Sequence, residues 1–151
     1  MVKKILIGFF VFIIIFIGIV GFFIYNGFGP NSDLAISDKF ANTVAIEVFQ
    51  NNNYDFLLNN STPKALEEFK KDKSRKMFSD LKQYFGEVKS ISEPITEVKS
   101  GINTETGSEK IANSYLDVEF KNGKGRIYLT LKHHEKRWKI QYVNLKKQSN
   151  K

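Results

Sequence analysis

Three short stretches of the sequence hold the residues that could do chemistry. The first is the run at 123–126, whose letters GKGR would suit a loop that holds phosphate. Such a loop needs its glycines to lead into the N-terminus of a helix. The residues that follow, up to Leu131, instead alternate between apolar and polar side chains, as a β-strand does. The run therefore predicts the bend of a β-hairpin.

The second stretch is the strand before that bend, which carries the carboxylates Asp117 and Glu119 on one face. A two-residue turn at Asn122 and Gly123 is a strong hairpin signal, and it would place Glu119 opposite Arg126. Opposite charges facing each other across a hairpin stabilise it. We therefore expect these carboxylates to lie on a solvated sheet face and not to act as a general base.

The third stretch holds the two histidines of the chain, His133 and His134, which we expect in a turn. Adjacent turn residues point in different directions, which suits neither a pair of metal ligands nor a base oriented by a carboxylate. The absence of cysteine excludes thiolate zinc sites, disulfides and thiol nucleophiles. The sequence thus predicts no catalytic, cofactor-binding or metal-binding residue, and we expect no enzyme.

The charge pattern does not favour a nucleic-acid site. The 151 residues carry a net charge of +7, mostly as scattered lysines that do not cluster around exposed aromatic residues. The densest positive run, KKDKSRK at 70–76, indicates a hydrated helix face. The alternative is that this run lies on anionic lipid headgroups.

The N-terminus has the pattern of a membrane anchor. No charged residue occurs over residues 5–25, and a helix of that length spans about 31 Å, close to the thickness of a bilayer core. A cleavable signal peptide is the alternative, but its apolar region is shorter and ends in a small-x-small site. Lys3 and Lys4 place residues 1–4 in the cytoplasm. We expect a single-pass protein with a linker at 26–37 and its remaining residues exported, periplasmic or extracellular.

Helical patterns fill the first half of the exported part. Ser37 or Asp38 could cap a helix that runs to the asparagines at 51–53. Its apolar stripe consists of Phe40, Ala41, Val44, Ala45, Val48 and Phe49. A short helical turn is expected at 54–58, and Thr62 followed by Pro63 predicts another helix start. A last helix at 74–85 should present Met77, Phe78, Leu81, Tyr84 and Phe85 on one side and end at Gly86.

Strand patterns fill the second half. Strands are expected at 88–91 and 95–98, followed by a polar loop at 101–110, the hairpin described above, and a second hairpin whose return strand begins near Arg137. Helices first and strands afterwards indicate an α+β domain over 38–146, with the helices packed on a curved antiparallel sheet of about four strands. Residues 147–151 form a basic tail.

This layout resembles the nuclear-transport-factor-2-like, or cystatin-like, cone fold, and most closely its small bacterial families of unknown function. The resemblance lies in the order of elements and in three positions, Tyr54, Gly86 and Trp138. The glycine-bearing hairpin and tryptophan-containing strand are also similar, more weakly, to the singly anchored cytochrome oxidase assembly factor family.

The resemblance implies a fold that serves enzymes, small-ligand binders and scaffolds, so it does not choose a function. We expect a membrane-anchored, non-catalytic domain that acts in protein–protein interaction or envelope assembly, without cofactor. The alternative is a small apolar or lipid-like ligand bound in the cone. In that case the pocket would be lined by Tyr84, Phe85, Trp138 and Tyr142.

Overall fold

The computed structural model describes residues 32–103 and 107–148. The expected anchor at 5–25 and the last residues of the basic tail lie outside these ranges. Within them, no helix has the length and apolar character needed to cross a membrane. The chain divides into two units between Ile36 and Ser37, and the second contains the sheet.

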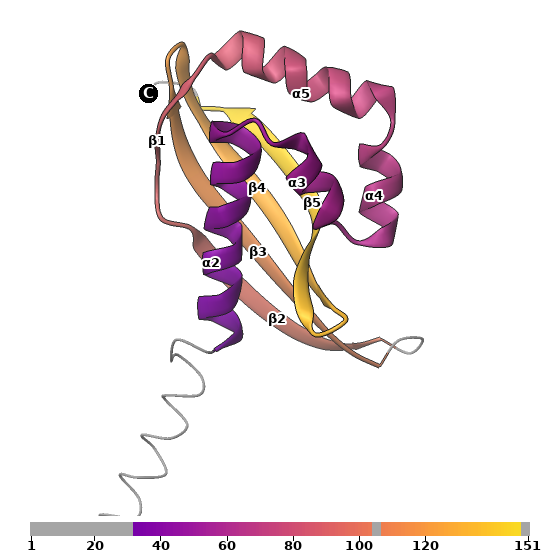
Figure 1. Ribbon diagram of the computed structural model, residues 1–151. Coiled ribbons are helices and arrows are strands. Elements are labelled where there is room, and N and C mark those ends of the chain that lie inside the picture. Colours follow the sequence, from indigo (N-terminus) through magenta and orange to yellow (C-terminus); the bar gives the residue numbers. More distant parts are fainter. Residues whose placement is uncertain (1–31, 104–106, 149–151) are drawn as a thin grey trace, which may run out of the picture. The chain divides into compact units, whose positions relative to one another are not determined.

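The domain is α+β, with its helices before its strands (Figure 1). The helical elements are α2 (Asp33–Ala45), the π-helical turn η1 (Ile46–Gln50), α3 (Tyr54–Asn59), α4 (Pro63–Phe69) and α5 (Asp72–Phe85). The strands are β1 (Val88–Ile91), β2 (Ile95–Asn103), β3 (Gly107–Phe120), β4 (Gly123–His134) and β5 (Arg137–Lys147). The sequence predicted about four strands, and the described residues form five.

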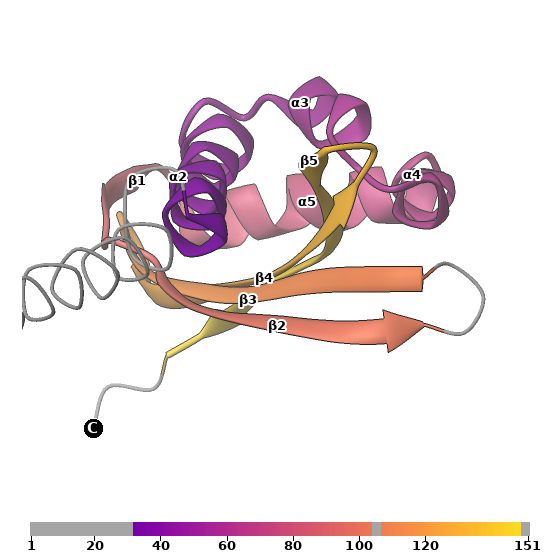
Figure 2. The ribbon, with the colours of Figure 1, turned by 90° about the horizontal axis from the view of Figure 1, so that it is seen from below.

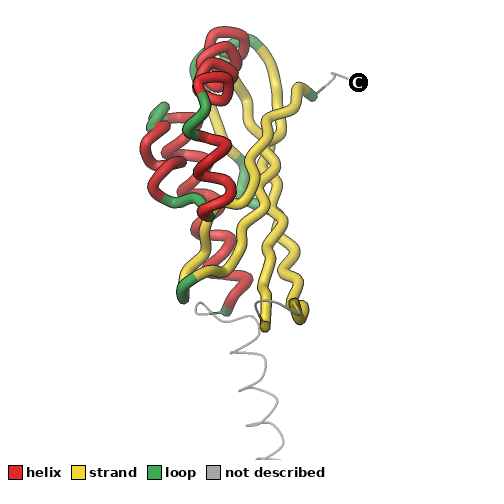
Figure 3. The backbone as a smooth tube through the Cα atoms, turned by 90° about the vertical axis from the view of Figure 1, so that its right-hand side faces the viewer, coloured by secondary structure: helices red, strands yellow, loops and turns green. Residues whose placement is uncertain are grey.

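The helices and the sheet form two layers. Figure 2 and Figure 3 show the described helices on one face of the sheet and no described helix on the other. The strands are antiparallel in the order β1–β3–β4–β5, and β2 also pairs with β3, beside the part of β3 that β1 leaves free. The long strand β3 therefore joins both halves of the sheet.

Strand alternation places the core between the two layers. Alternate residues of β3 and β4 are buried there, and β5 contributes Trp138, Ile140, Val143 and Leu145. From the helices, the fully or nearly buried apolar residues are Ala41, Val44, Ala45, Val48, Leu57, Ala65 and Phe85. The apolar stripe predicted for residues 38–49 is therefore the face that packs on the sheet.

The first helix begins earlier than predicted. It starts at Asp33, inside the expected linker, because the Ser32 hydroxyl accepts a hydrogen bond from the amide of Ala35 at 3.2 Å. The α-helix ends at Ala45 and continues as the π-helical turn η1, which ends as predicted at the asparagines, where the Asn51 amide donates to the carbonyl of Ile46.

The signals at Thr62 and Gly86 are confirmed. Thr62 is the N-cap of α4, with Pro63 in the first turn, and Gly86 follows α5 with a φ of 74°. The face predicted for α5 is partly wrong: Phe78, Leu81 and Phe85 pack on the core, whereas Met77 and Tyr84 are exposed. Five apolar residues within nine positions span more of the helix circumference than the sheet can cover.

The predicted register of the first hairpin is wrong by one residue on each strand. The turn is centred on Lys121 and Asn122, so Arg126 faces Asp117 and Glu119 faces Lys124. The physical reason lies outside the hairpin. The amides of Lys121 and Asn122 donate to the carbonyls of Glu87 and Phe85, at 2.8 and 3.0 Å, which fixes the turn against the end of α5.

Two loop predictions are also corrected. The polar stretch at 101–110 is mostly strand, because β2 extends to Asn103 and β3 begins at Gly107. The histidines do not lie in the turn of the second hairpin; they end β4, and the turn is formed by Glu135 and Lys136, which both have positive φ.

Candidate functional site

The face of the sheet away from the helices presents apolar and aromatic side chains to solvent. Ile95, Tyr115 and Tyr128 lie directly opposite one another on β2, β3 and β4. Tyr142 on β5 occupies the same face, opposite Thr130. Ile95, Tyr128 and Tyr142 are 58%, 38% and 52% exposed. We call this set of four residues the tyrosine face.

A cluster of charges borders the tyrosine face. Arg126 donates two hydrogen bonds to the Asp117 carboxylate, at 2.6 and 3.0 Å, and its guanidinium lies 4.6 Å from the centre of the Tyr115 ring. Gln148 donates a third hydrogen bond to Asp117, at 2.6 Å. These bonds, first those from Arg126, lower the pKa of Asp117. The carboxylate therefore stays ionised at neutral pH and is a weak base.

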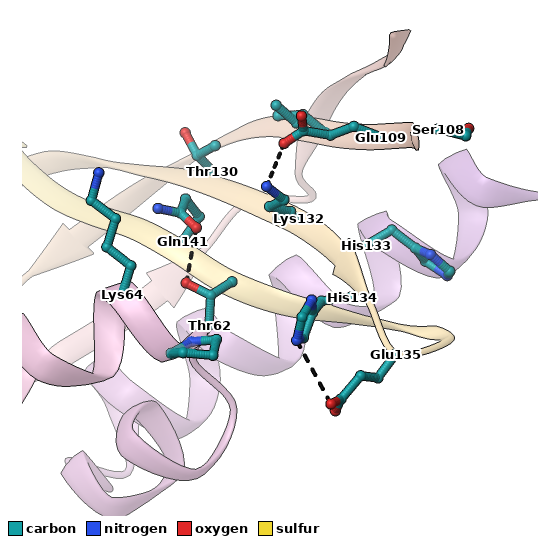
Figure 4. Close-up of a pocket in the computed structure, with 12 residues that line it drawn as sticks. Thr62, Lys64, Ser108, Glu109, Thr130, Lys132, His133, His134, Glu135 and Gln141 are labelled. Carbon is teal, nitrogen blue, oxygen red and sulfur yellow. Dashed lines mark hydrogen bonds and ion pairs between the residues drawn. The ribbon is translucent and has the colours of Figure 1, made fainter. Parts of the chain in front are cut away.

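A hollow of about 740 Å³ lies where the start of α4, the start of β3 and the end of β4 meet (Figure 4). The β-bulge at Gln141, between the pairs Thr130–Tyr142 and Leu131–Ile140, increases the local twist of the β4–β5 hairpin. The segment before α4 fixes that hairpin from the side, because the amides of Thr62 and Ile140 donate to the carbonyls of Ile140 and Asn60.

The polar residues of the hollow are largely engaged with one another. Glu109 pairs with Lys132, and the Thr62 hydroxyl donates to the side-chain oxygen of Gln141 at 2.8 Å (Figure 4). Both signs of charge and several hydroxyl groups line the hollow, so its chemistry fits no single class of ligand.

The histidines at the hollow do not form a catalytic pair. The His133 ring packs edge-on against Trp138, 5.4 Å between centres, whereas His134 Nε2 lies 3.8 Å from the Glu135 carboxylate. That carboxylate accepts a hydrogen bond from Lys139, which lowers the pKa of Glu135. Lowering a carboxyl pKa makes it a poorer general base at neutral pH.

The four residues predicted to line a cone pocket are not brought together. Phe85 and Trp138 are buried in the core, and Phe85 packs on Phe120 at 4.8 Å between ring centres. Tyr84 is exposed on α5, and Tyr142 lies on the opposite side of the sheet, on the tyrosine face.

Side chains fill the space between the layers where a cone ligand would lie. The crevice between α5 and the sheet, lined among others by Phe78, Leu81 and Leu145, has a volume of about 30 Å³. That volume is far below the hundreds of cubic ångströms that small-molecule sites occupy.

The basic run at 70–76 is exposed where α5 begins. Lys71 pairs with Glu68, and the Arg75 guanidinium lies 4.8 Å from the centre of the Tyr54 ring. Desolvation raises the pKa of Tyr54, whose hydroxyl donates to the carbonyl of Phe69 at 2.7 Å. Two of the cationic groups thus have partners within the domain, as on an ordinary hydrated helix face.

Sequence reasoning missed most of the tyrosine face. Tyr142 was predicted to line an internal pocket, and Ile95, Tyr115 and Tyr128 were not singled out. Strand alternation could have found Tyr128, because it shares a face with Arg126 two residues earlier. The contribution of Ile95 depends on which strand pairs with β3, which alternation does not reveal.

Among the described residues, no group of three or more histidines and carboxylates is placed to hold a metal ion. Comparison of the chain with protein-family models, with curated proteins and with solved structures gives no significant match. The choice of a candidate site therefore rests on the geometry of the domain alone. The tyrosine face is the most distinctive surface of the described residues.

Proposed function

We propose that this chain is a membrane-tethered, non-catalytic domain that binds another protein on the tyrosine face. In this proposal residues 5–25 anchor the chain with its N-terminus in the cytoplasm, and residues 38–146 form an exported domain of the nuclear-transport-factor-2-like cone class. The uncharged apolar run supports the anchor. The order of helices and strands, with helices on one face of an antiparallel sheet, supports the fold class.

The observation that carries the proposal is the exposure of Ile95, Tyr128 and Tyr142 on one uncovered sheet face. No other described element packs on this face (Figure 2). Tyrosine is enriched in the energetically important parts of protein interfaces because it buries a large area and keeps a hydroxyl for hydrogen bonding. Arg126 and Lys146, which lie beside Tyr115 and Tyr128, add cations to the border of the surface.

The ligand alternative has less support. It needs a cavity lined by Trp138 and Tyr142, and these residues lie on opposite faces of the sheet. A protein partner on the outside of the sheet requires no internal space, so the geometry favours it.

The proposal is tested with the full chain, extracted in mild detergent after cross-linking in intact cells. We expect a cross-linked protein that co-purifies with the parent chain and is reduced at least tenfold in the Tyr128→Ser/Tyr142→Ser double variant. Tyr84→Ser is the matched control, because Tyr84 is 58% exposed but lies on α5. Equal recovery of the partner from all three chains would contradict the proposal.

A further inference from the structure

Among the described residues, none pairs with the outer edge of β2. All nine residues from Ile95 to Asn103 pair with β3 in continuous register, without a bulge. No other described strand lies on the far side of β2. An unbulged edge strand presents a row of backbone donors and acceptors that can pair with a further strand.

The sequence of β2 is complementary to itself when two copies run antiparallel. We propose that β2 pairs with β2 of a second copy of this chain, around a two-fold axis at Val98, so that the two sheets join edge to edge. In this register, position 97 faces position 99 of the other copy. Glu97 then faces the other Lys99, and by symmetry Lys99 faces the other Glu97.

The remaining pairs in this register fit by size as well as charge. Ile95 would lie opposite Gly101, where a side-chain carbon added to the glycine would meet no atom within 4 Å. Ile95 is 58% exposed and lies on the same face as Gly101. Thr96 would face Ser100 on the opposite face, beside the central pair of Val98 residues.

Charge explains why a second copy fits better than an unrelated edge strand. An exposed lysine on an edge strand disfavours pairing with most other strands, because its charge either meets a like charge or loses its hydration without an opposite charge in return. Lys99 and Glu97 already form an ion pair within one copy, 3.3 Å apart, with both side chains more than 60% exposed. Pairing with a second copy would extend this ion pair into a square of four alternating charges. Lys99, which disfavours pairing with other strands, would then favour pairing with a second copy of this chain.

The proposed contact depends on the proposed tether for its strength. Seven paired residues on each side form a small interface, below the roughly 1,200 Å² that stable complexes bury. Two copies held in one membrane meet at a high effective concentration, which compensates for weak intrinsic affinity. The partner inferred here is therefore a neighbouring copy in the same membrane.

The absence of cysteine allows a sharp test of the register. We use the full chain carrying Val98→Cys, reconstituted in phospholipid vesicles and treated with copper phenanthroline or a short bifunctional thiol reagent. The two thiols would face each other at the axis, within reach of a covalent link, so we expect a disulfide-linked or bridged dimer. Ser100→Cys is the control: it lies on the same face, but its two copies would be about 13 Å apart in this register.

Charge reversal tests the partner. Added to Val98→Cys, either Glu97→Lys or Lys99→Glu places like charges opposite each other twice, and we expect the cross-linked fraction to fall about tenfold. A mixture of the two single-reversal chains should cross-link again, because each lysine then faces a glutamate. The double exchange E97K/K99E should restore linking within one chain type. Glu119→Lys, the same charge change on β3, should have no effect.

The outcomes separate this inference from the proposed function. The register would be overturned if the Ser100→Cys and Val98→Cys chains gave equal cross-linked fractions, or if charge reversal left the cross-linked fraction of the Val98→Cys chain unchanged. Absence of any link in the Val98→Cys chain would overturn the pairing itself. Neither result would change the loss of a cross-linked partner on substitution of Tyr128 and Tyr142, which tests the tyrosine face alone.

Discussion

At the scale of single residues, Arg126 donates two hydrogen bonds to the Asp117 carboxylate across the first hairpin. We expect Asp117→Asn to destabilise the domain by about 0.5–1 kcal/mol at pH 7, because the pair is partly exposed and solvent weakens it. The measurement is urea unfolding of the full chain in detergent, followed through the fluorescence of Trp138, the single tryptophan.

The pH dependence follows from the lowered pKa of Asp117. A carboxylate with a pKa lowered by folding stabilises the native state above its unfolded pKa and loses that contribution as pH falls through its folded pKa. The difference between parent and Asp117→Asn should therefore be constant from pH 5 to 7 and shrink below about pH 4. Glu119→Gln is the control, and a larger effect for it would support the register predicted from sequence over the one observed.

At the scale of elements, Gly86 lies between α5 and β1 and sits against the turn of the first hairpin. Its φ of 74° is unfavourable for other residues, and an added side-chain carbon would lie 3.2 Å from Lys121 Cβ and Asn122 Nδ2. We expect Gly86→Ala to destabilise the domain by about 1–2 kcal/mol, measured by the same urea unfolding.

The matched control is Gly101→Ala, which meets no atom within 4 Å and has no left-handed backbone. We expect its unfolding free energy to stay within about 0.5 kcal/mol of the parent value. If both glycine variants lost stability equally, the junction between α5 and the hairpin would not be the cause.

The elements that sequence predicts well are those whose signal is local. The helix over 38–49 and the ends at Thr62 and Gly86 follow from periodicity, capping and backbone preference, which act within a few residues. The register of the first hairpin is different, because carbonyls at Glu87 and Phe85 set it from more than 30 positions away. Rules based on neighbouring residues cannot predict a contact between residues so far apart in the sequence.

The extension of β2 shows a second limit. Beyond Val98, β2 holds three polar residues, one glycine and the 91% exposed Ile102, so no apolar–polar alternation marks a strand there. Pairing with β3 supplies their backbone hydrogen bonds regardless of side-chain type.

For the candidate site, the sequence identified Tyr142 as notable but placed it in an interior that the fold fills with Phe85, Trp138 and their neighbours.

At the scale of the whole molecule, the described helices pack on one face of the sheet, and no described element covers the other face or pairs with the outer edge of β2. The two surfaces point to different tasks, since the tyrosine face offers side chains and the β2 edge offers backbone groups. A copy paired at the edge would extend the tyrosine face into a continuous double surface. The proposed partner would then meet two sets of tyrosines, and its affinity would rise through two-site binding.

At this scale the proposed membrane arrangement predicts on which side of the membrane each end of the chain lies, and the lack of cysteine makes this measurable by single-thiol labelling. Ser79 is exposed on α5 in the domain that we propose to be exported, and Val2 lies before the apolar run. In spheroplasts of a bacterial host, a membrane-impermeant maleimide should label the Ser79→Cys chain at once and the Val2→Cys chain after lysis alone. The positive charges of Lys3 and Lys4 are the reason for this expectation, because such charges before an apolar run favour a cytoplasmic N-terminus. Both chains should also stay in the membrane at alkaline pH, whereas a chain lacking residues 2–25 should not.

Labelling of the Val2→Cys chain before lysis would show the opposite orientation. Recovery of a shortened chain that alkaline pH extracts from the membrane would show a cleaved signal peptide in place of an anchor.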